Sequence, residues 1–142
     1  MVITHAYDNL SKHREADTQA QVTAAVDAFA AIAVAMEAGE EHGPPELYPC
    51  YALLQQEAIE GLADLRTPGD ETGSTGPATP VGDVHVAVTT EFVPDLAEVA
   101  RLGGLVCEVL LRAAPGIPDP EPKLALINAA AHAARIRDLV AP

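Results

Sequence analysis

The sequence contains no tryptophan and few basic residues. It has 8 Lys and Arg against 21 Asp and Glu, so its formal net charge is −13. Nucleic-acid-binding proteins hold phosphates with clustered Lys and Arg, so we expect no nucleic-acid partner. The longest uncharged apolar stretch, Ala28 to Met36, is too short to span a bilayer, and the N-terminus lacks the pattern of a signal peptide. We therefore expect a cytoplasmic chain with no membrane partner.

Cysteine and the common cofactor motifs are also scarce. Cys50 and Cys107 lie far apart, and two cysteines in 142 residues indicate reduced thiols rather than a disulfide framework. The sequence has neither Gly-x-x-x-x-Gly-Lys nor Gly-x-Gly-x-x-Gly, which excludes the ordinary phosphate-binding loops. It also lacks Glu-x-x-His, a motif of ferritin-like di-iron sites. We therefore expect no resident cofactor.

Alanine and aliphatic residues are abundant. Apolar residues make up 49% of the chain, which is too many for a disordered protein, and the length suits one domain. The Ala and Gly content resembles that of proteins from GC-rich bacteria such as actinomycetes. We therefore treat residues 1–142 as a single domain of a bacterial protein.

Apolar residues recur at helical spacing in four segments. Gly39 and Gly43 offer an end to the first helix, Pro44 begins the second, and Asp119 with Pro120 begins the fourth. The predicted helices span residues 17–38, 44–65, 94–113 and 119–140. We predict an all-α fold, a bundle of four main helices. The polar stretch before the first helix, 4–14, remains open as a short separate helix.

Two segments between the second and third helices do not fit this pattern. Thr67 to Gly82 holds four Gly, three Pro and four Thr, which predicts a mobile loop. In residues 83–90, valines alternate with other residues, which favours a short β element. The alternative is a helix that begins at Asp83 and bends at Pro94.

The first and fourth helices carry more apolar surface than one small bundle needs. One face of the first helix consists of four small residues, Ala24, Ala28, Ala31 and Ala35. The fourth helix has a seam with steps of three and four, Leu126, Ala129, Ala133, Ile136 and Val140. We expect a homodimer in which at least one of these faces is buried between subunits.

Three polar residues of the fourth helix share one face. Asn128, His132 and Arg135 are spaced i, i+4 and i+7 among alanines. Such a trio suits a small-molecule ligand, with His132 as acid or base, Arg135 as an anchor and Asn128 orienting the same group. This predicts a small-molecule site between helices, for binding or simple acid–base chemistry in a biosynthetic pathway. The alternative is a polar helix edge without a ligand.

A second candidate site is acidic. Glu57 and Glu60, with Asp64 after them, lie on the second helix, and Asp95 and Glu98 open the third. If those two helices pair antiparallel, their carboxylates converge and suit Mg²⁺ with a polyphosphate.

This layout resembles MazG-type nucleotide pyrophosphohydrolases, whose signature is Glu-x-x-Glu on one helix and Glu-x-x-Asp on the next. Here the second half, Asp95-x-x-Glu98, has the reversed order. The resemblance implies Mg²⁺-dependent hydrolysis with Glu57, Glu60, Asp95 and Glu98 as metal ligands. A third alternative is a non-enzymatic regulatory or scaffolding protein that holds partners on its Ala-rich faces.

Overall fold

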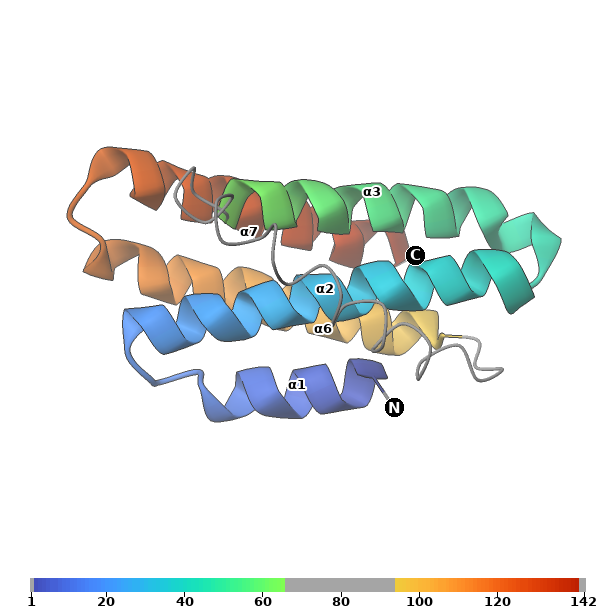
Figure 1. Ribbon diagram of the computed structural model, residues 1–142, viewed down its shortest axis with the longest axis horizontal. Helices are drawn as coiled ribbons and strands as arrows, with labels where there is room; N and C mark the ends of the chain where they lie inside the picture. Colours follow the sequence, from blue (N-terminus) through green and yellow to red (C-terminus); the bar gives the residue numbers. More distant parts are fainter. Residues whose placement is uncertain (1, 66–93, 141–142) are drawn as a thin grey trace, which may run out of the picture.

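The computed structural model describes residues 2–65 and 94–140. These residues form five α-helices, which run lengthwise beside one another in Figure 1: α1 (Val2–Lys12), α2 (Thr18–His42), α3 (Tyr48–Leu65), α6 (Leu96–Ala113) and α7 (Pro120–Val140). Short 3-10 turns at Pro45–Leu47 and Ala114–Gly116 lie at two of the corners. The predicted all-α fold is confirmed for these residues. The predicted loop at 67–82 and β element at 83–90 lie outside them.

The number of helices differs from the prediction. The described part of the chain has five rather than four, because the polar N-terminal stretch forms α1. Ile3, Ala6 and Leu10 are spaced i, i+3 and i+7, and all three are buried. Three apolar side chains on one face are enough to dock this short helix against α2 and α6.

The ends of α2 follow from side-chain and backbone chemistry. Asp17 caps its first turn by accepting a hydrogen bond from the Ala20 amide at 2.8 Å. The helix continues past Gly39 and ends at His42, where the Gly43 amide donates to the Gly39 carbonyl at 2.7 Å. A Cβ on Gly39 would lie 2.9 Å from the Tyr51 ring. Gly39 therefore serves the close approach of α3, and the predicted end at residue 38 is four residues too early.

The packing order of the helices decides which side chains meet. Helix α3 packs on α2 and α7, whereas α6 packs on α7, α2 and α1. In Figure 1, α2 and α3 lie in front of α6 and α7, so α3 and α6 occupy opposite corners. At the α6/α7 contact, a Cβ on Gly103 would lie 3.0 Å from the Ala133 carbonyl oxygen. The absence of a side chain at Gly103 therefore allows α6 and α7 to approach closely.

The two small-residue faces are covered by the chain's own helices. The predicted alanine face of α2 is buried, as are four of the five seam residues of α7, Leu126, Ala129, Ala133 and Ile136. These faces are therefore buried from solvent without a second subunit. The homodimer stays a prediction.

Helix α2 is long and apolar enough, by length and composition alone, to cross a membrane. Most of its apolar residues pack inside the protein, including Phe29, Ile32 and Met36, which are fully buried. The core helix of a soluble protein has the same properties, so this observation is weak evidence for a membrane span.

Candidate functional site

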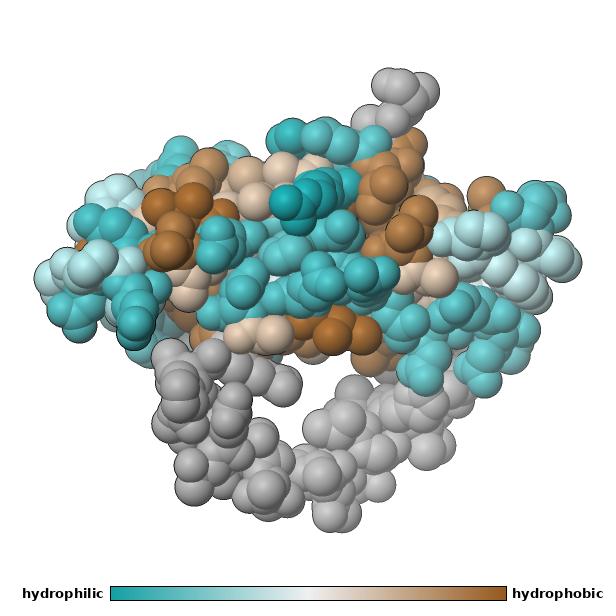
Figure 2. Space-filling view, turned by 90° about the horizontal axis from the view of Figure 1, so that it is seen from above, coloured by the Kyte–Doolittle hydropathy of each residue, from teal (hydrophilic) through white to brown (hydrophobic). Residues whose placement is uncertain are grey.

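Charged side chains of α3 and α7 meet on one face of the molecule. The two helices run in opposite directions (Figure 1) and pack together. Glu57, Glu60 and Asp64 are spaced i, i+3 and i+7 on α3, and His132 and Arg135 are spaced i and i+3 on α7. We call these five residues the α3/α7 cluster. Figure 2 looks onto this face and shows a hydrophilic band between apolar groups.

The His132 imidazole lies at the centre of the cluster. Its side chain is only 15% exposed, and both ring nitrogens face carboxylates. Nδ1 lies 2.7 Å from Glu57 Oε1 and 3.7 Å from Glu60 Oε1, and Nε2 lies 3.2 Å from Asp64 Oδ2. Carboxylates of α3 therefore lie against both nitrogens of a ring that α7 carries.

One oxygen in the cluster is left unsatisfied. Asp64 Oδ2 is buried and makes no hydrogen bond, although it lies 3.2 Å from His132 Nε2. The distance suits an ion pair, but the contact does not have the geometry of a hydrogen bond. A buried polar atom without a partner is unfavourable, so this oxygen is available to orient the ring.

Arg135 makes looser contacts at the edge of the cluster. Its side chain is 56% exposed, and Nη1 lies 3.4 Å from Glu57 Oε1 and 3.0 Å from His132 Nδ1. Nδ1 accepts from Arg135 only when it carries no proton, and it donates to Glu57 only when it does. The contact with Arg135 therefore requires Nδ1 without its proton, and the hydrogen bond to Glu57 requires Nδ1 with it.

The cluster has the charge and spacing of a cation site. Three carboxylates outnumber the single guanidinium, so the cluster is negative even when His132 is protonated. Glu57, Glu60 and His132 each offer one ligand atom, and these atoms all lie within 4.8 Å of one another. Carboxylate oxygen and imidazole nitrogen are common ligands of divalent metals. Glu57, Glu60 and His132 are therefore the residues of this face that could hold a metal ion.

The structure brings together two residues from each predicted site. His132 and Arg135 come from the predicted small-molecule trio, and Glu57 and Glu60 from the predicted acidic set. Asn128 is exposed on α7 one turn before His132. Asp64 belongs to the predicted acidic site but was not among its four predicted metal ligands. Its spacing from Glu57 and Glu60 places it on the same face of α3.

The other two predicted metal ligands lie elsewhere. Asp95 caps α6 by accepting from the Ala97 amide at 2.9 Å. Glu98 accepts from Thr4 Oγ1 at 3.2 Å and pairs with Arg101 at 3.6 Å. Because α3 and α6 occupy opposite corners, the structure does not bring these two acids to Glu57 and Glu60.

Neither cysteine is placed as a nucleophile. Cys50 and Cys107 are free and half-buried. Burial raises the pKa of both thiols, and at Cys107 the nearby Arg137 only partly opposes this effect. A raised pKa lowers the thiolate fraction and with it the reactivity. Chemistry on this chain is therefore better sought in the α3/α7 cluster.

No family model, no curated protein and no solved structure matches this chain. Function is therefore inferred from the geometry of the described residues.

Proposed function

We propose that the α3/α7 cluster binds a divalent metal ion, which forms a small-molecule site together with the side chains around it. The observation that carries the proposal is the approach of three ligand atoms, from Glu57, Glu60 and His132, to within 4.8 Å of one another. This joins two predictions, the small-molecule site with His132 and the acidic metal site with Glu57 and Glu60. In the proposed ligand set, His132 takes the place of the predicted ligands Asp95 and Glu98.

The ligand set favours a transition metal over Mg²⁺. Mg²⁺ prefers oxygen ligands and keeps several waters, whereas an imidazole ligand suits transition metals such as Zn²⁺ and Fe²⁺ better. A metal-binding histidine usually donates its other ring N–H to a carboxylate, which fixes the orientation of the ring. Asp64 Oδ2, at 3.2 Å from Nε2, is in place for that role. Three protein ligands leave coordination positions open for water or a substrate.

Titration of the purified chain with Mn²⁺ tests the proposal. Mn²⁺ binds thiolates weakly, so the two cysteines should not compete with the cluster for the metal. We expect Mn²⁺ to raise the melting temperature, since a ligand of the folded state alone stabilises it. Calorimetry should show one site per chain. Glu57→Gln and His132→Ala should remove both responses, and Mg²⁺ should act more weakly than Mn²⁺.

Glu98→Gln is the matched control, because it makes the same charge change on α6, away from the cluster. It should leave Mn²⁺ binding unchanged. A chain that does not bind Mn²⁺, or equal losses in Glu57→Gln and Glu98→Gln, would contradict the metal site.

A second candidate function is proton transfer without a metal. It is favoured by the contacts of His132 with carboxylates at both ring nitrogens, 2.7 Å to Glu57 and 3.2 Å to Asp64. Such contacts orient an imidazole that moves protons near neutral pH. Because the cluster is negative, its ligand would be cationic, for example an amine. Mn²⁺ binding decides between the two candidates, since the second requires none.

We further propose that α2, α3, α6 and α7 form a four-helix bundle with α1 packed on its side.

We also propose that the chain forms a homodimer. Large apolar side chains remain exposed on the two helices of the cluster, Leu53, Ile59, Leu124, Ile127 and Leu139. These side chains support a surface that binds a second copy of the chain. A scaffolding protein would use the same kind of surface to hold its partners. Light scattering during size-exclusion chromatography should give twice the chain mass of 14.8 kDa. A single-chain mass would contradict the dimer.

A further inference from the structure

Arg135 and a metal ion would compete for the same place. Its Nη1 atom lies 3.0 Å from His132 Nδ1 and 3.4 Å from Glu57 Oε1. Zn²⁺, for example, binds imidazole nitrogen at about 2.0–2.1 Å and carboxylate oxygen at about 2.0–2.2 Å. Two positive groups that close to the same two atoms repel each other strongly. Arg135 must therefore move when a cation binds.

The contacts of Arg135 are weak enough for this movement. Its side chain is 56% exposed, and one nitrogen makes both contacts. Arg14 shows what a firmly held arginine looks like in this protein, because its Nε and Nη2 atoms lie 2.9 and 2.8 Å from Glu108 Oε2. Arg135 has no comparable double contact. A rotation of its long side chain carries the guanidinium to the solvent side of the cluster.

We propose that Arg135 gives way to the metal and then binds the oxyanion of a small phosphate or carboxylate held by that metal. This rests on the proposed metal site and names the substrate class of the same site. The guanidinium presents parallel N–H donors that match a carboxylate or phosphate. The open coordination positions of the metal accept another oxygen of the same anion.

The charge of the cluster dictates the order of binding. Without a cation, Glu57, Glu60 and Asp64 repel an anion. A divalent ion offsets most of this charge, and the released Arg135 supplies a further positive charge at the edge of the site. The site therefore admits an oxyanion only after the metal, and the metal-free chain should bind none.

Two titrations test the inference on the full chain. In the first, the electron paramagnetic resonance signal of free Mn²⁺ measures metal affinity. Removal of a competing positive charge in Arg135→Ala should tighten Mn²⁺ binding about threefold or more. Arg137→Ala is the matched control, because Arg137 lies two residues further along α7 and pairs with Asp138 at 3.0 Å. It makes the same net charge change away from the cluster and should have a smaller effect.

In the second titration, calorimetry follows methyl phosphate and acetate binding to the Mn²⁺-loaded chain. At least one anion should bind, and which one binds more tightly separates a phosphate substrate from a carboxylate substrate. Arg135→Ala should weaken that binding about tenfold or more, the loss expected for a charge-assisted hydrogen bond. Arg137→Ala should bind as the unaltered chain does.

The outcomes separate the two proposals. If the unaltered chain does not bind Mn²⁺, the metal site itself is wrong. If Mn²⁺ binds but neither anion does, or if Arg135→Ala and Arg137→Ala behave alike in either titration, the role of Arg135 is overturned while the metal site stands. Anion binding to the metal-free chain would also overturn it.

Discussion

Helix α3 makes two interfaces of opposite character. Toward α2 it presents apolar and small residues that are buried, among them Tyr51, Leu54, Ala58 and Gly61. Toward α7 it presents the carboxylates of the cluster. The first interface is determined by shape, because the Phe29 ring fills the space over Gly61. The second is determined by charge, and its polar groups are incompletely paired.

The difference separates folding from function within one helix. Burial of apolar groups stabilises the α2 side without any polar partner. On the α7 side, carboxylates crowd one imidazole and Asp64 Oδ2 is left without a hydrogen bond. Apolar residues would pack two helices equally well or better. Residues that do not favour the fold, such as incompletely paired polar groups, are expected at functional sites. This expectation favours the cluster over the α2 side as the functional site.

The largest effect is expected from crowding the shape-determined side. In Gly61→Ala, the new Cβ would lie 2.6 Å from two carbons of the Phe29 ring, which is completely buried. Because this buried ring has to shift to make room, overpacking should lower the free energy of unfolding by about 1–3 kcal/mol. Urea denaturation measures this change.

Gly104→Ala is the control for helix propensity. Its Cβ would meet only Arg137 Cδ, at 3.6 Å, an ordinary contact. Replacing Gly by Ala in a helix then stabilises by up to about 1 kcal/mol. If both variants were stabilised, the α2 side of α3 would be adaptable and its contrast with the α7 side would disappear.

A smaller effect should distinguish a structural charge network from the cluster. Glu108 Oε2 pairs with Arg14 at 2.8 Å and Arg112 at 3.3 Å, and thus links the segment before α2 to α6. Glu108→Gln should lower the free energy of unfolding by about 0.5–1 kcal/mol, and high salt should reduce the difference.

Glu60→Gln should not destabilise the chain in the same way. Glu60 is 47% exposed and lies 3.7 Å from His132, on the same α3 face as two other acids. Relief of repulsion offsets the lost attraction, so the change should stay within about 0.5 kcal/mol. Chemical denaturation of both variants at low and high salt measures the contrast. Equal losses in the two variants would make the cluster a second structural network.

The sequence predicts the positions of the helices better than it predicts which helices pack against one another. Periodicity and caps located α2, α3, α6 and α7 because both act within a few residues. The short α1 was left open, since three apolar residues give a weak pattern. The end of α2 was placed too early because Gly39 faces Tyr51, a contact made between helices.

The candidate site shows the same limit more sharply. Spacing correctly placed His132 with Arg135 and Glu57 with Glu60, since each pair lies on one helix. It did not indicate that α3 faces α7 and lies across from α6. Both neighbours offer acids or polar groups, and only the packing of apolar faces over the whole chain decides between them. The joining of the two half-sites therefore required the structure.

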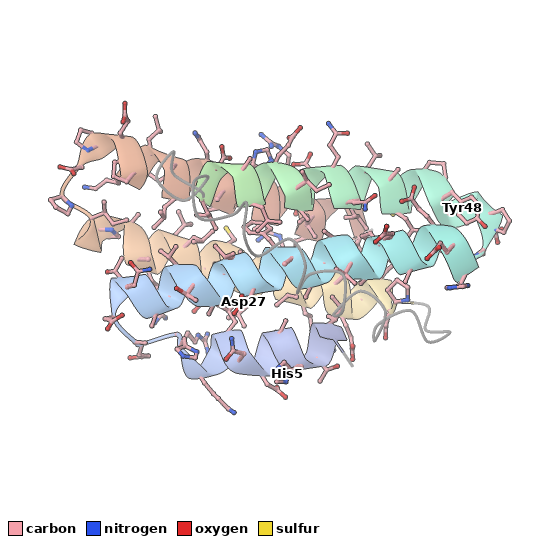
Figure 3. All side chains as sticks on the ribbon, in the orientation of Figure 1. His5, Asp27 and Tyr48 are labelled. Carbon is pink, nitrogen blue, oxygen red and sulfur yellow. The ribbon has the colours of Figure 1, made fainter. Side chains whose placement is uncertain are left out.

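The smallest effect concerns a third interface, between α1 and α2. Figure 3 shows Asp27 on the edge of α2 that faces α1. Partial burial raises the pKa of Asp27 above its ordinary value of 3.8, and the charge of His13 opposes this shift. A raised pKa means that the folded chain binds this proton more tightly than the unfolded chain. The resulting stabilisation is complete below pH 3.8 and is lost as the pH rises through the folded-state pKa.

Asp27→Asn keeps a neutral side chain at every pH, so it should be more stable than the unaltered chain at pH 7 and equal to it near pH 3. The gain should be only a few tenths of a kcal/mol, because much of the side chain is exposed and solvent screens its charge. Melting curves from pH 3 to pH 7 measure it, with Asp8→Asn on the exposed side of α1 as the control for removing one negative charge. A gain that persists at pH 3, or one that Asp8→Asn reproduces, would show that net charge rather than burial sets the effect. The effect of Asp27 on stability would then be that of any surface charge. The contrast between structural and functional charges would in that case depend on the α3/α7 cluster alone.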